Sequence, residues 1–443
     1  MTIICNWSTA LLACPFCSLN LTLTERIEQA HDCYVVEWLS GREGNADGGD
    51  PGATQLRIVR VFKTTSPAKQ VGDELTLPHF SYGQPGEVHL LFGHLRDGEV
   101  LSWDGLMACS PDLLDYLDRR PGPELAEAER LSAFIPYLEH PDETIAVDAY
   151  SEFGNARYSA VRGVAPRFPR ALLLRWITEP AEETGRIARI GLYGMLLGLC
   201  GGEQESAALE RVILTPGEDF RIGIDGIMAG YLLIRGTPGL EVLKQHALAA
   251  NAPSSEVFAY QQALKFLWEY APERIPSDQL RMALRPLVDS PEFAELAIVE
   301  LARWEDLSLT EKLIDRYSHP DFSNQPTQTA IARYYLTMST LDPAGRSEAD
   351  QTTIALAGQR LEELRKRDPE LVQHADRFLR SAQRTPTVTE REVPVLAVNA
   401  APHSEGPSSA AGERPGGWLA LIAAGAFSLF VLARRLWQLR TTS

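Results

Sequence analysis

Two stretches in the middle of the chain decide the fold: RIARIGLYGMLLG at residues 186–198 and RIGIDGIMAGYLLI at residues 221–234. Each is long enough for roughly three or more helical turns, and each is apolar on nearly every side. Glycines recur in both stretches at three- and four-residue spacing, which places them on one face of a helix. We therefore predict two buried helices that approach each other closely, and we prefer this interpretation to a phosphate-binding loop.

Segments of the same character recur along the chain, at residues 145–156, 257–270, 293–304 and 329–341. The spacings are 42, 35, 37, 35 and 35 residues when the equivalent positions are Ala149, Gly191, Gly226, Ala263, Ile298 and Arg333. Repeats of this length with two helices each are typical of a helical solenoid. We expect the solenoid to occupy residues 122–382, with the more charged helix at residues 350–367 capping the stack.

The helical region resembles HEAT repeats in its period and in its pattern of small residues. HEAT repeats often stack an Asp and an Arg from neighbouring helices into a ladder. Asp148, Arg189 and Asp225 lie near equivalent positions here, so the resemblance implies that they are ladder partners. Asp225, which lies inside the apolar run IGIDGIMAGY, could instead be an acid with a perturbed pKa.

Aromatic residues are frequent in the repeats. We expect most of them to pack in the core or between repeats, and any that face solvent on one side of the stack could anchor a protein or peptide partner. These residues are Tyr193, Tyr231, Tyr260, Phe266, Trp268, Tyr270, Trp304, Tyr334 and Tyr335.

Residues 14–118 carry a different pattern, with short strand-like runs between loops rich in Gly, Asp and Pro. A short helix is expected first, at residues 20–32, with Thr22 or Thr24 as its cap. Several short strands in so short a stretch indicate a small barrel or sandwich. The predicted strands are residues 33–39, 55–63, 74–77, 88–92 and 100–103.

The same region contains a cysteine pair, then IVRVFK, VGDELTLP, PGEVHLLFG and a late cysteine in LMACS. In this order of features it resembles the netrin-like fold of tissue inhibitors of metalloproteases, an OB-type barrel. In that family N-terminal cysteines are bridged to later strands or loops, so the resemblance implies a disulfide from Cys109 to Cys14 or Cys17. It also implies protease inhibition as a candidate function, which would require a free α-amine on Cys14.

The motif Cys14-Pro-Phe-Cys17 has three possible roles: a structural disulfide, a thiol–disulfide exchange site, or, at Cys14, lipid attachment. No strand–helix–strand context of a redox domain surrounds it, which favours the structural role. Cys33 and Cys200 are expected to be buried free thiols. The motif lacks a second cysteine pair for a zinc site and a following histidine for haem attachment.

Three histidines, His79, His89 and His94, lie in the β region and could in principle bind a metal. His89 and His94 are five residues apart, which puts them on opposite faces of a regular strand. We therefore predict no metal site and no cofactor. We also find no GxSxG elbow and no other catalytic constellation.

The C-terminal end predicts a membrane helix at residues 417–437, where Trp418 and Trp437 are interface anchors and Arg434 and Arg435 can snorkel. The arginines follow the helix, so the tail at residues 438–443 is expected in the cytoplasm. The larger N-terminal part would then be outside, behind a short export signal at residues 1–13. Residues 383–416, rich in Pro and small residues, are predicted to be a disordered tether.

The composition is that of a globular protein that can bury a sizeable core. The chain has 443 residues, 44% of them hydrophobic, and a net charge of −17, which argues against nucleic acid as a partner. The sequence thus predicts an α+β multidomain protein: an OB-like β-barrel, a HEAT-like solenoid and one transmembrane helix. The whole layout also resembles bacterial membrane-anchored proteins that begin with CPFCS, a resemblance that implies no activity.

We expect a non-enzymatic scaffold that binds extracytoplasmic proteins at the cytoplasmic membrane. One alternative is a membrane-tethered thiol–disulfide oxidoreductase that uses Cys14 and Cys17. The second alternative is a netrin-like protease inhibitor.

Overall fold

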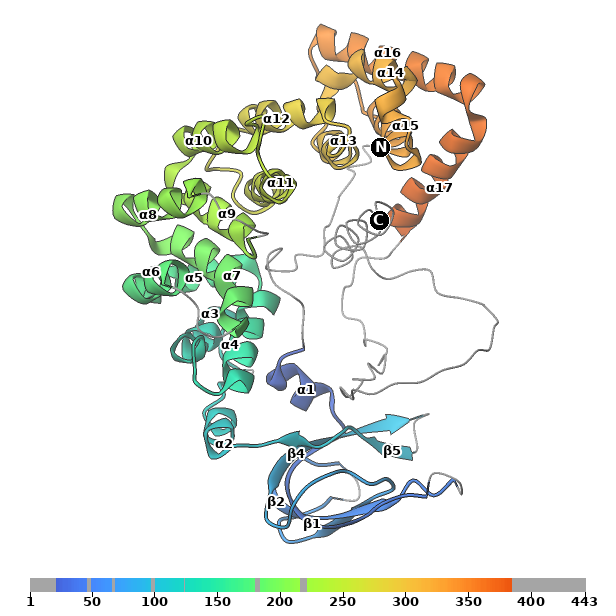
Figure 1. Cartoon of the computed structure of the whole chain (residues 1–443). Coiled ribbons are helices and arrows are strands. Elements are labelled where there is room, and N and C mark those ends of the chain that lie inside the picture. Colours follow the sequence, from blue (N-terminus) through green and yellow to red (C-terminus); the bar gives the residue numbers. More distant parts are fainter. Residues whose placement is uncertain are drawn as a thin grey trace, which may run out of the picture. The chain divides into compact units, whose positions relative to one another are not determined.

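The computed structural model describes residues 21–384, apart from residues 46–48, 66–67, 97–99, 123, 180–183 and 216–220. An antiparallel sheet comes first and a long series of helices follows, which is an α+β arrangement (Figure 1). The predicted export signal, tether and membrane helix lie outside these residues. Within the described part of the chain, no helix is both long enough and apolar enough to cross a membrane.

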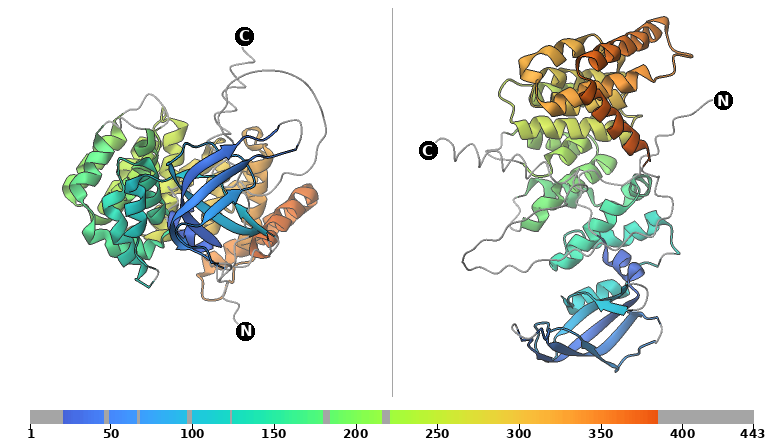
Figure 2. Two further views of the ribbon diagram at one scale, coloured as in Figure 1. Left: turned by 90° about the horizontal axis from the view of Figure 1, so that it is seen from below. Right: turned by 90° about the vertical axis from the view of Figure 1, so that its right-hand side faces the viewer.

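The sheet has the strand order β3-β2-β1-β4-β5, and a short strand β6 also pairs with β4. Figure 2 shows this sheet as blue arrows in two further views. Shifts of register between β1 and β2 mark bulges, which increase strand twist and help the sheet to curl. No pairing between β3 and β5 closes the described strands into a barrel. The strands are β1 Asp32–Arg42, β2 Ala53–Lys63, β3 Glu74–Leu77, β4 Val88–Arg96, β5 Val100–Trp103 and β6 Met107–Ala108.

Both faces of β1 are buried along its first half. Tyr34 and Val36 belong to a core cluster on one face, whereas Cys33 and Val35 pack with residues of the helices on the other. This explains why β1 begins with consecutive buried residues instead of alternating ones. All five predicted strands are confirmed, and three of them are longer than predicted. β6 has only two residues, which is too short for a periodic signal.

The predicted N-terminal helix is α1, Leu23–Gln29. Thr22 caps it: its side chain accepts a hydrogen bond from the Glu25 backbone, and the Glu25 side chain accepts one from the Thr22 backbone. The other helices are α2 Pro111–Asp118, α3 Glu127–Phe134, α4 Glu143–Asn155, α5 Tyr158–Val164, α6 Arg170–Thr178, α7 Thr184–Cys200, α8 Glu203–Leu214, α9 Ile224–Arg235, α10 Thr237–Ala247, α11 Ser254–Tyr270, α12 Ser277–Leu284, α13 Ala294–Arg303, α14 Lys312–Ser318, α15 Gln325–Ser339, α16 Glu348–Arg367 and α17 Pro369–Arg384.

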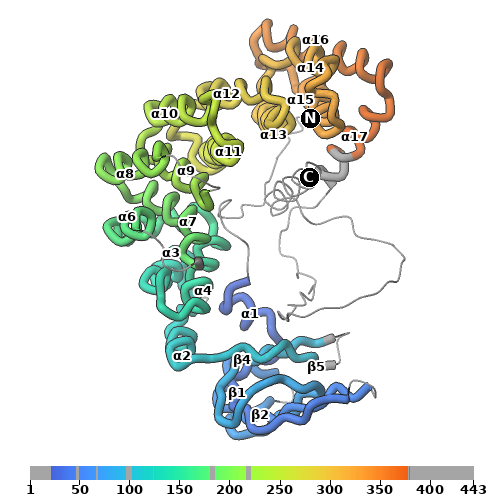
Figure 3. The backbone as a smooth tube through the Cα atoms, in the orientation of Figure 1, coloured from blue at the N-terminus to red at the C-terminus, as the bar shows by residue number. Residues whose placement is uncertain are grey.

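From α6 onward the helices form two layers in a solenoid-like stack (Figure 3). The helices α7, α9, α11, α13 and α15 form one layer, which we call the odd layer. The helices α6, α8, α10, α12 and α14 pack against it and form the even layer. Each segment predicted from the repeat pattern is a helix, and together they are α4 and the whole odd layer.

The glycines of α7 and α9 form a close helix–helix contact, as predicted. A Cβ atom at Gly230 would lie 1.9 Å from the Gly194 carbonyl oxygen, and one at Gly226 would lie 2.1 Å from the Gly191 carbonyl oxygen. These are backbone atoms, which no side-chain movement can clear. All residues from Gly226 to Leu233 are buried, so α9 has no solvent-facing side along this stretch.

Candidate functional site

One face of the odd layer points away from the even layer and carries polar side chains. On α11 four half-exposed residues fall on a single stripe, because they are spaced by four, three and four positions: Phe258, Gln262, Lys265 and Glu269. Tyr260 lies on the opposite side of α11 and donates a hydrogen bond of 3.1 Å to the Ala283 carbonyl oxygen in α12. We call the side of α11, α13 and α15 that faces away from the even layer the open face.

Four charged residues form a continuous row between α11 and α13. Lys265 Nζ lies 3.4 Å from a carboxylate oxygen of Glu300, and Arg303 lies 3.5 Å from the same carboxylate. Arg303 also lies 3.6 Å from Glu269. Their side chains are between 11% and 32% exposed, so the pairs are only partly screened by water. We call these four residues the charged row.

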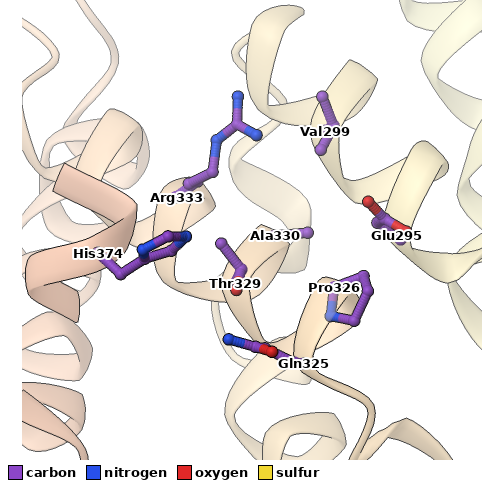
Figure 4. A pocket seen from close by; sticks show the side chains of 8 residues that line it. All are labelled: Glu295, Val299, Gln325, Pro326, Thr329, Ala330, Arg333 and His374. Atoms are coloured by element: carbon purple, nitrogen blue, oxygen red, sulfur yellow. The ribbon is translucent and has the colours of Figure 1, made fainter. Parts of the chain in front are cut away.

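A cavity of about 370 Å³ lies on the same face, between α13, α15 and α17 (Figure 4). Its lining mixes charged, polar and apolar side chains. Glu295 and His374 lie on opposite sides of the space, and Arg333 lies toward a third side. The remaining lining residues are Val299, Gln325, Pro326, Thr329 and Ala330.

The two central charges of this cavity are both penalised by burial. Desolvation raises the pKa of Glu295, and the positive charge of Arg333 only partly offsets that rise. Desolvation also lowers the pKa of Arg333, and Glu295 acts in the opposite direction. Among the described residues, Glu295 forms no ion pair or hydrogen bond. The two groups therefore sense each other's charge without neutralising each other by direct contact.

The helix α17 supplies one wall of the cavity. It begins directly after Asp368, whose carboxylate accepts a hydrogen bond of 3.0 Å from the Leu371 backbone. Leu371, Val372 and Ala375 are buried, and α17 packs against α15, while His374 reaches the cavity. The predicted helical region, residues 122–382, includes most of α17. The predicted cap, residues 350–367, does not include it, so nothing in the sequence indicated that a further helix returns to the open face.

The ladder implied by the HEAT resemblance is wrong for these residues. Asp148 accepts hydrogen bonds from the Leu23 backbone at 2.5 Å and from the Tyr116 hydroxyl at 2.6 Å. Asp225 accepts one from the Gly226 backbone, and burial raises its pKa. Their positions in the repeats differ by one residue, which turns a helical side chain by about 100° away from its expected partner.

Arg189, the third ladder residue, forms a different buried cluster. It is 3% exposed, and it contacts Glu139 at 2.9 Å and Glu143 at 2.8 Å. The hydroxyl of Tyr193 lies 2.6 Å from Glu139 and 2.8 Å from the Leu138 carbonyl oxygen. This cluster joins α7 to the segment between α3 and α4 and to the start of α4, so its role is structural.

Most of the repeat aromatics are buried, as predicted. Trp268 stacks on Trp304 with 4.5 Å between ring centroids, and Trp304 itself is 1% exposed. The fully buried members are Tyr193, Tyr231, Tyr260, Phe266, Tyr334 and Tyr335. The open face is therefore formed mainly by charged and polar residues. The sequence patterns did not identify these residues as a site, and Arg333 was noted only as the equivalent position of the last repeat.

The cysteine predictions are tested only in part. Cys33, Cys109 and Cys200 are buried and form no disulfide with one another, and burial raises the pKa of Cys33 to about 12 and that of Cys109 to about 11. Thiols with such high pKa values are poor nucleophiles near neutral pH. Cys14 and Cys17 lie outside the described residues, so a bridge to Cys109 and a redox role both stay predictions.

The histidines of the sheet do not come together. His89 is buried, His94 lies 3.5 Å from Asp104, and His79 belongs to the loop after β3. In the described part of the chain, no group of three or more His, Cys, Asp or Glu side chains is arranged to hold a metal ion. The anchors Trp418, Arg434, Arg435 and Trp437 are outside the described residues.

A cluster of largely buried acidic residues connects α1 to α4. The Asn155 side chain donates a hydrogen bond of 2.9 Å to Glu25, and Asp148 holds the start of α1 through the Leu23 backbone. The pKa of Glu152 is raised to about 7, mainly by burial and also by the negative charges of Asp148 and Glu25, whereas the Thr24 and Thr22 hydroxyls act in the opposite direction. Burial also raises the pKa of Asp148.

We predict that Glu152→Gln stabilises the protein at pH 8 and changes little at pH 5. In the unfolded chain the Glu152 side chain titrates near 4.5, whereas in the folded protein it titrates at about 7. Between these two pH values the folded protein binds more protons than the unfolded chain does. The free energy of unfolding therefore falls as pH rises through this window. The full effect is about 3 kcal/mol. Urea-unfolding midpoints at pH 5 and pH 8 measure it.

Glu179→Gln is the matched control for this prediction, because Glu179 is 52% exposed and pairs with the similarly exposed Arg175 on the surface of α6. Its unfolding midpoint should change little at either pH. If the stability of the Glu152→Gln variant and that of the unmodified protein depend on pH in the same way, the pKa of Glu152 is not raised in the folded protein.

No protein-family model matches this chain, and a search of curated proteins finds no match. The site must therefore be interpreted from its own chemistry.

Proposed function

We propose that this chain is a binding protein whose open face receives an extracytoplasmic protein partner. The observation that supports this most is the charged row, which places donors and acceptors in one strip on a face that the even layer does not cover. Two-layered helical stacks expose such a face over several helices at once, which suits the binding of an extended partner.

The mixed charge of this face matches a polar partner better than a purely apolar one. Lys265 and Arg303 alternate with Glu269 and Glu300, so a partner segment can find both donors and acceptors there. Ion pairs of this kind contribute to orientation and to the choice of partner more than to affinity. The apolar part of the contact would come from Phe258 and Val299, which are half-exposed beside the row.

The proposal extends to the location of the protein. The apolar run at residues 417–437 supports anchorage by one membrane helix, and the arginines after it support an outside position for the binding region. The curled sheet is compatible with an OB-like domain at the N-terminal side of the stack. The tether at residues 383–416 would let the binding region reach partners at a distance from the membrane.

A photo-crosslinking experiment in cells that express the full chain tests this proposal. A photoreactive amino acid replaces Gln262 on the open face, and a second variant carries it at Arg211, an exposed position of α8 in the even layer. We expect a discrete protein adduct from position 262 and none from position 211. The additional change Lys265→Glu should weaken the adduct several-fold, because it inverts one charge of the row.

Adducts of equal intensity from both positions, or none from position 262, would refute binding at the open face. A strong adduct that Lys265→Glu leaves unchanged would refute the role of the charged row.

A further inference from the structure

A strongly basic stretch interrupts this acidic chain. Residues 153–178 contain no Asp or Glu, although the net charge of the whole chain is −17. The stretch includes α5 and α6, and α6 belongs to the even layer, on the side of the stack opposite to the open face. Its charge comes from five arginines, which are Arg157, Arg162, Arg167, Arg170 and Arg175.

Two of these arginines have no acidic partner. Among the described residues, neither Arg167 nor Arg170 forms an ion pair, and both are exposed. Arg167 donates a hydrogen bond of 2.7 Å to the Ser132 hydroxyl, which carries no charge. The other three arginines each contact a carboxylate, in the pairs Arg157 with Glu127, Arg162 with Glu273 and Arg175 with Glu179.

The outward side of α6 combines positive charge with an exposed apolar side chain. Leu173 and Ile177 are buried, and α6 packs against α7. Leu172 is 41% exposed, and it shares a face with Arg175, three positions further along the helix. Arg170 is the first residue of α6. We call Arg167, Arg170, Leu172 and Arg175 the arginine surface.

This combination fits the surface of an anionic lipid bilayer. The planar guanidinium group binds phosphate oxygens through two parallel hydrogen bonds, and a leucine beside it can enter the boundary between headgroups and acyl chains. An anionic bilayer would repel most of this acidic protein but attract the arginine surface. The distribution of charge would therefore orient the protein on the bilayer.

The predicted membrane anchor would keep the arginine surface close to lipid. α17 ends at Arg384, and the predicted membrane helix begins at residue 417. A random coil as long as residues 385–416 has a root-mean-square length of about 30 Å, so a weak attraction would act at high effective concentration. This argument rests on the anchor in the proposed function, whereas the charge and exposure of the arginine surface do not.

We propose that the arginine surface binds the anionic phospholipid headgroups of a membrane. Arg167 and Arg170 contact lipid phosphates, and Leu172 lies at the boundary with the acyl chains. The binding leaves the open face turned away from the even layer and free for a protein partner, so the two interactions can occur together.

Photo-crosslinking of the full chain to lipid tests this proposal. The chain is reconstituted in nanodiscs of phosphatidylcholine alone or of phosphatidylcholine mixed with phosphatidylglycerol, and a photoreactive amino acid replaces Leu172. The matched control carries it at Leu214, which is 42% exposed at the end of α8. We expect mass spectrometry to find a lipid adduct at position 172 that is several-fold stronger with phosphatidylglycerol. The adduct at position 214 should be weaker in both kinds of nanodisc.

Charge reversal shows whether the arginines cause the contact. Arg167→Glu combined with Arg170→Glu should weaken the adduct at position 172 several-fold, because two attractive charges become repulsive. Arg211→Glu, at an exposed position of α8, should leave it unchanged. Urea-unfolding midpoints verify that each variant is folded. If the double variant unfolds, Arg170→Gln replaces it and should also weaken the adduct.

Several outcomes would overturn the inference. They are equal adducts at positions 172 and 214, equal adducts in the two kinds of nanodisc, or an adduct that the folded double variant leaves unchanged. A discrete protein adduct at position 172 in cells, without a lipid adduct, would also overturn it and assign the arginine surface to an acidic protein.

Recovery of the chain with nanodiscs tests the anchor separately. A chain that is recovered with phosphatidylcholine nanodiscs but forms no lipid adduct at position 172 would keep the anchor and refute the arginine surface. A chain that is recovered only with nanodiscs containing phosphatidylglycerol, and that forms the adduct, would support the arginine surface and refute the anchor.

Discussion

Replacing Gly230 with alanine is expected to lower the free energy of unfolding by about 3 kcal/mol, because the added methyl group meets backbone. Its Cβ would lie 1.9 Å from the Gly194 carbonyl oxygen and 2.6 Å from the Gly194 carbonyl carbon. The helices α7 and α9 would have to separate, and the buried contacts along both would loosen together. Alanine's better helix propensity returns about 1 kcal/mol at most, which is too little to compensate.

Gly358→Ala is the matched control for this prediction. Gly358 lies within α16, and a Cβ there would have the Ser339 Cβ atom at 4.0 Å as its nearest neighbour, so it fits without movement. This variant should be as stable as the unmodified protein or more stable, by up to about 1 kcal/mol. Urea unfolding, monitored by circular dichroism, compares the stabilities of the Gly230→Ala and Gly358→Ala variants. If both substitutions have the same effect, the close contact of α7 and α9 is not what holds these helices together.

Replacing Arg189 with methionine is expected to cost about 3 kcal/mol or more. The guanidinium is 3% exposed and neutralises Glu139 and Glu143, and methionine keeps most of the aliphatic bulk but removes the charge. Glu139, at 16% exposure, would then keep a carboxylate in a largely buried place beside the Tyr193 hydroxyl. The loss thus comes mainly from the uncompensated acid and less from lost packing.

Arg119→Met is the control for the Arg189 prediction. Arg119 also has a carboxylate partner, Asp115 at 3.0 Å, but both side chains are 70% exposed. Exposed pairs of this kind contribute between 0 and about 1 kcal/mol. The double variant Arg189→Met with Glu139→Gln should regain part of the lost stability, since it removes the stranded charge. A double variant that is less stable than Arg189→Met alone would contradict this account.

The repeating helices could be predicted from the sequence because their signal is local. Apolar periodicity and small residues place each helix of the odd layer, and the glycines of 186–198 and 221–234 predict the close contact between two of them. The strands of residues 32–103 were predicted for a related reason, since each is a short run of largely apolar residues between loops rich in Gly, Asp and Pro. The ends of β1, β2 and β4 were less certain, because pairing with neighbours lengthens a strand beyond its apolar residues.

The partners of the charged residues could not be predicted in the same way. Arg189 was expected beside Asp148 and Asp225, yet it contacts Glu139 and Glu143, which lie in a less periodic part of the chain. A difference of one residue in register leaves the apolar pattern almost unchanged but turns a charged side chain to another neighbour. The charged row and the cavity depend on such registers in several helices at once.

The order of a β region and a helical stack, the approximate bounds of the repeating helices and the face that carries the α7 and α9 glycines could all be predicted from the amino acids alone. These features follow from propensity and periodicity over one helix or strand at a time. The return of α17 to α15, and the meeting of Glu295, Arg333 and His374 around one cavity, depend instead on how the helices pack. Residues so far apart in the chain share no local pattern, and their meeting depends on how each helix is rotated when it packs against the next.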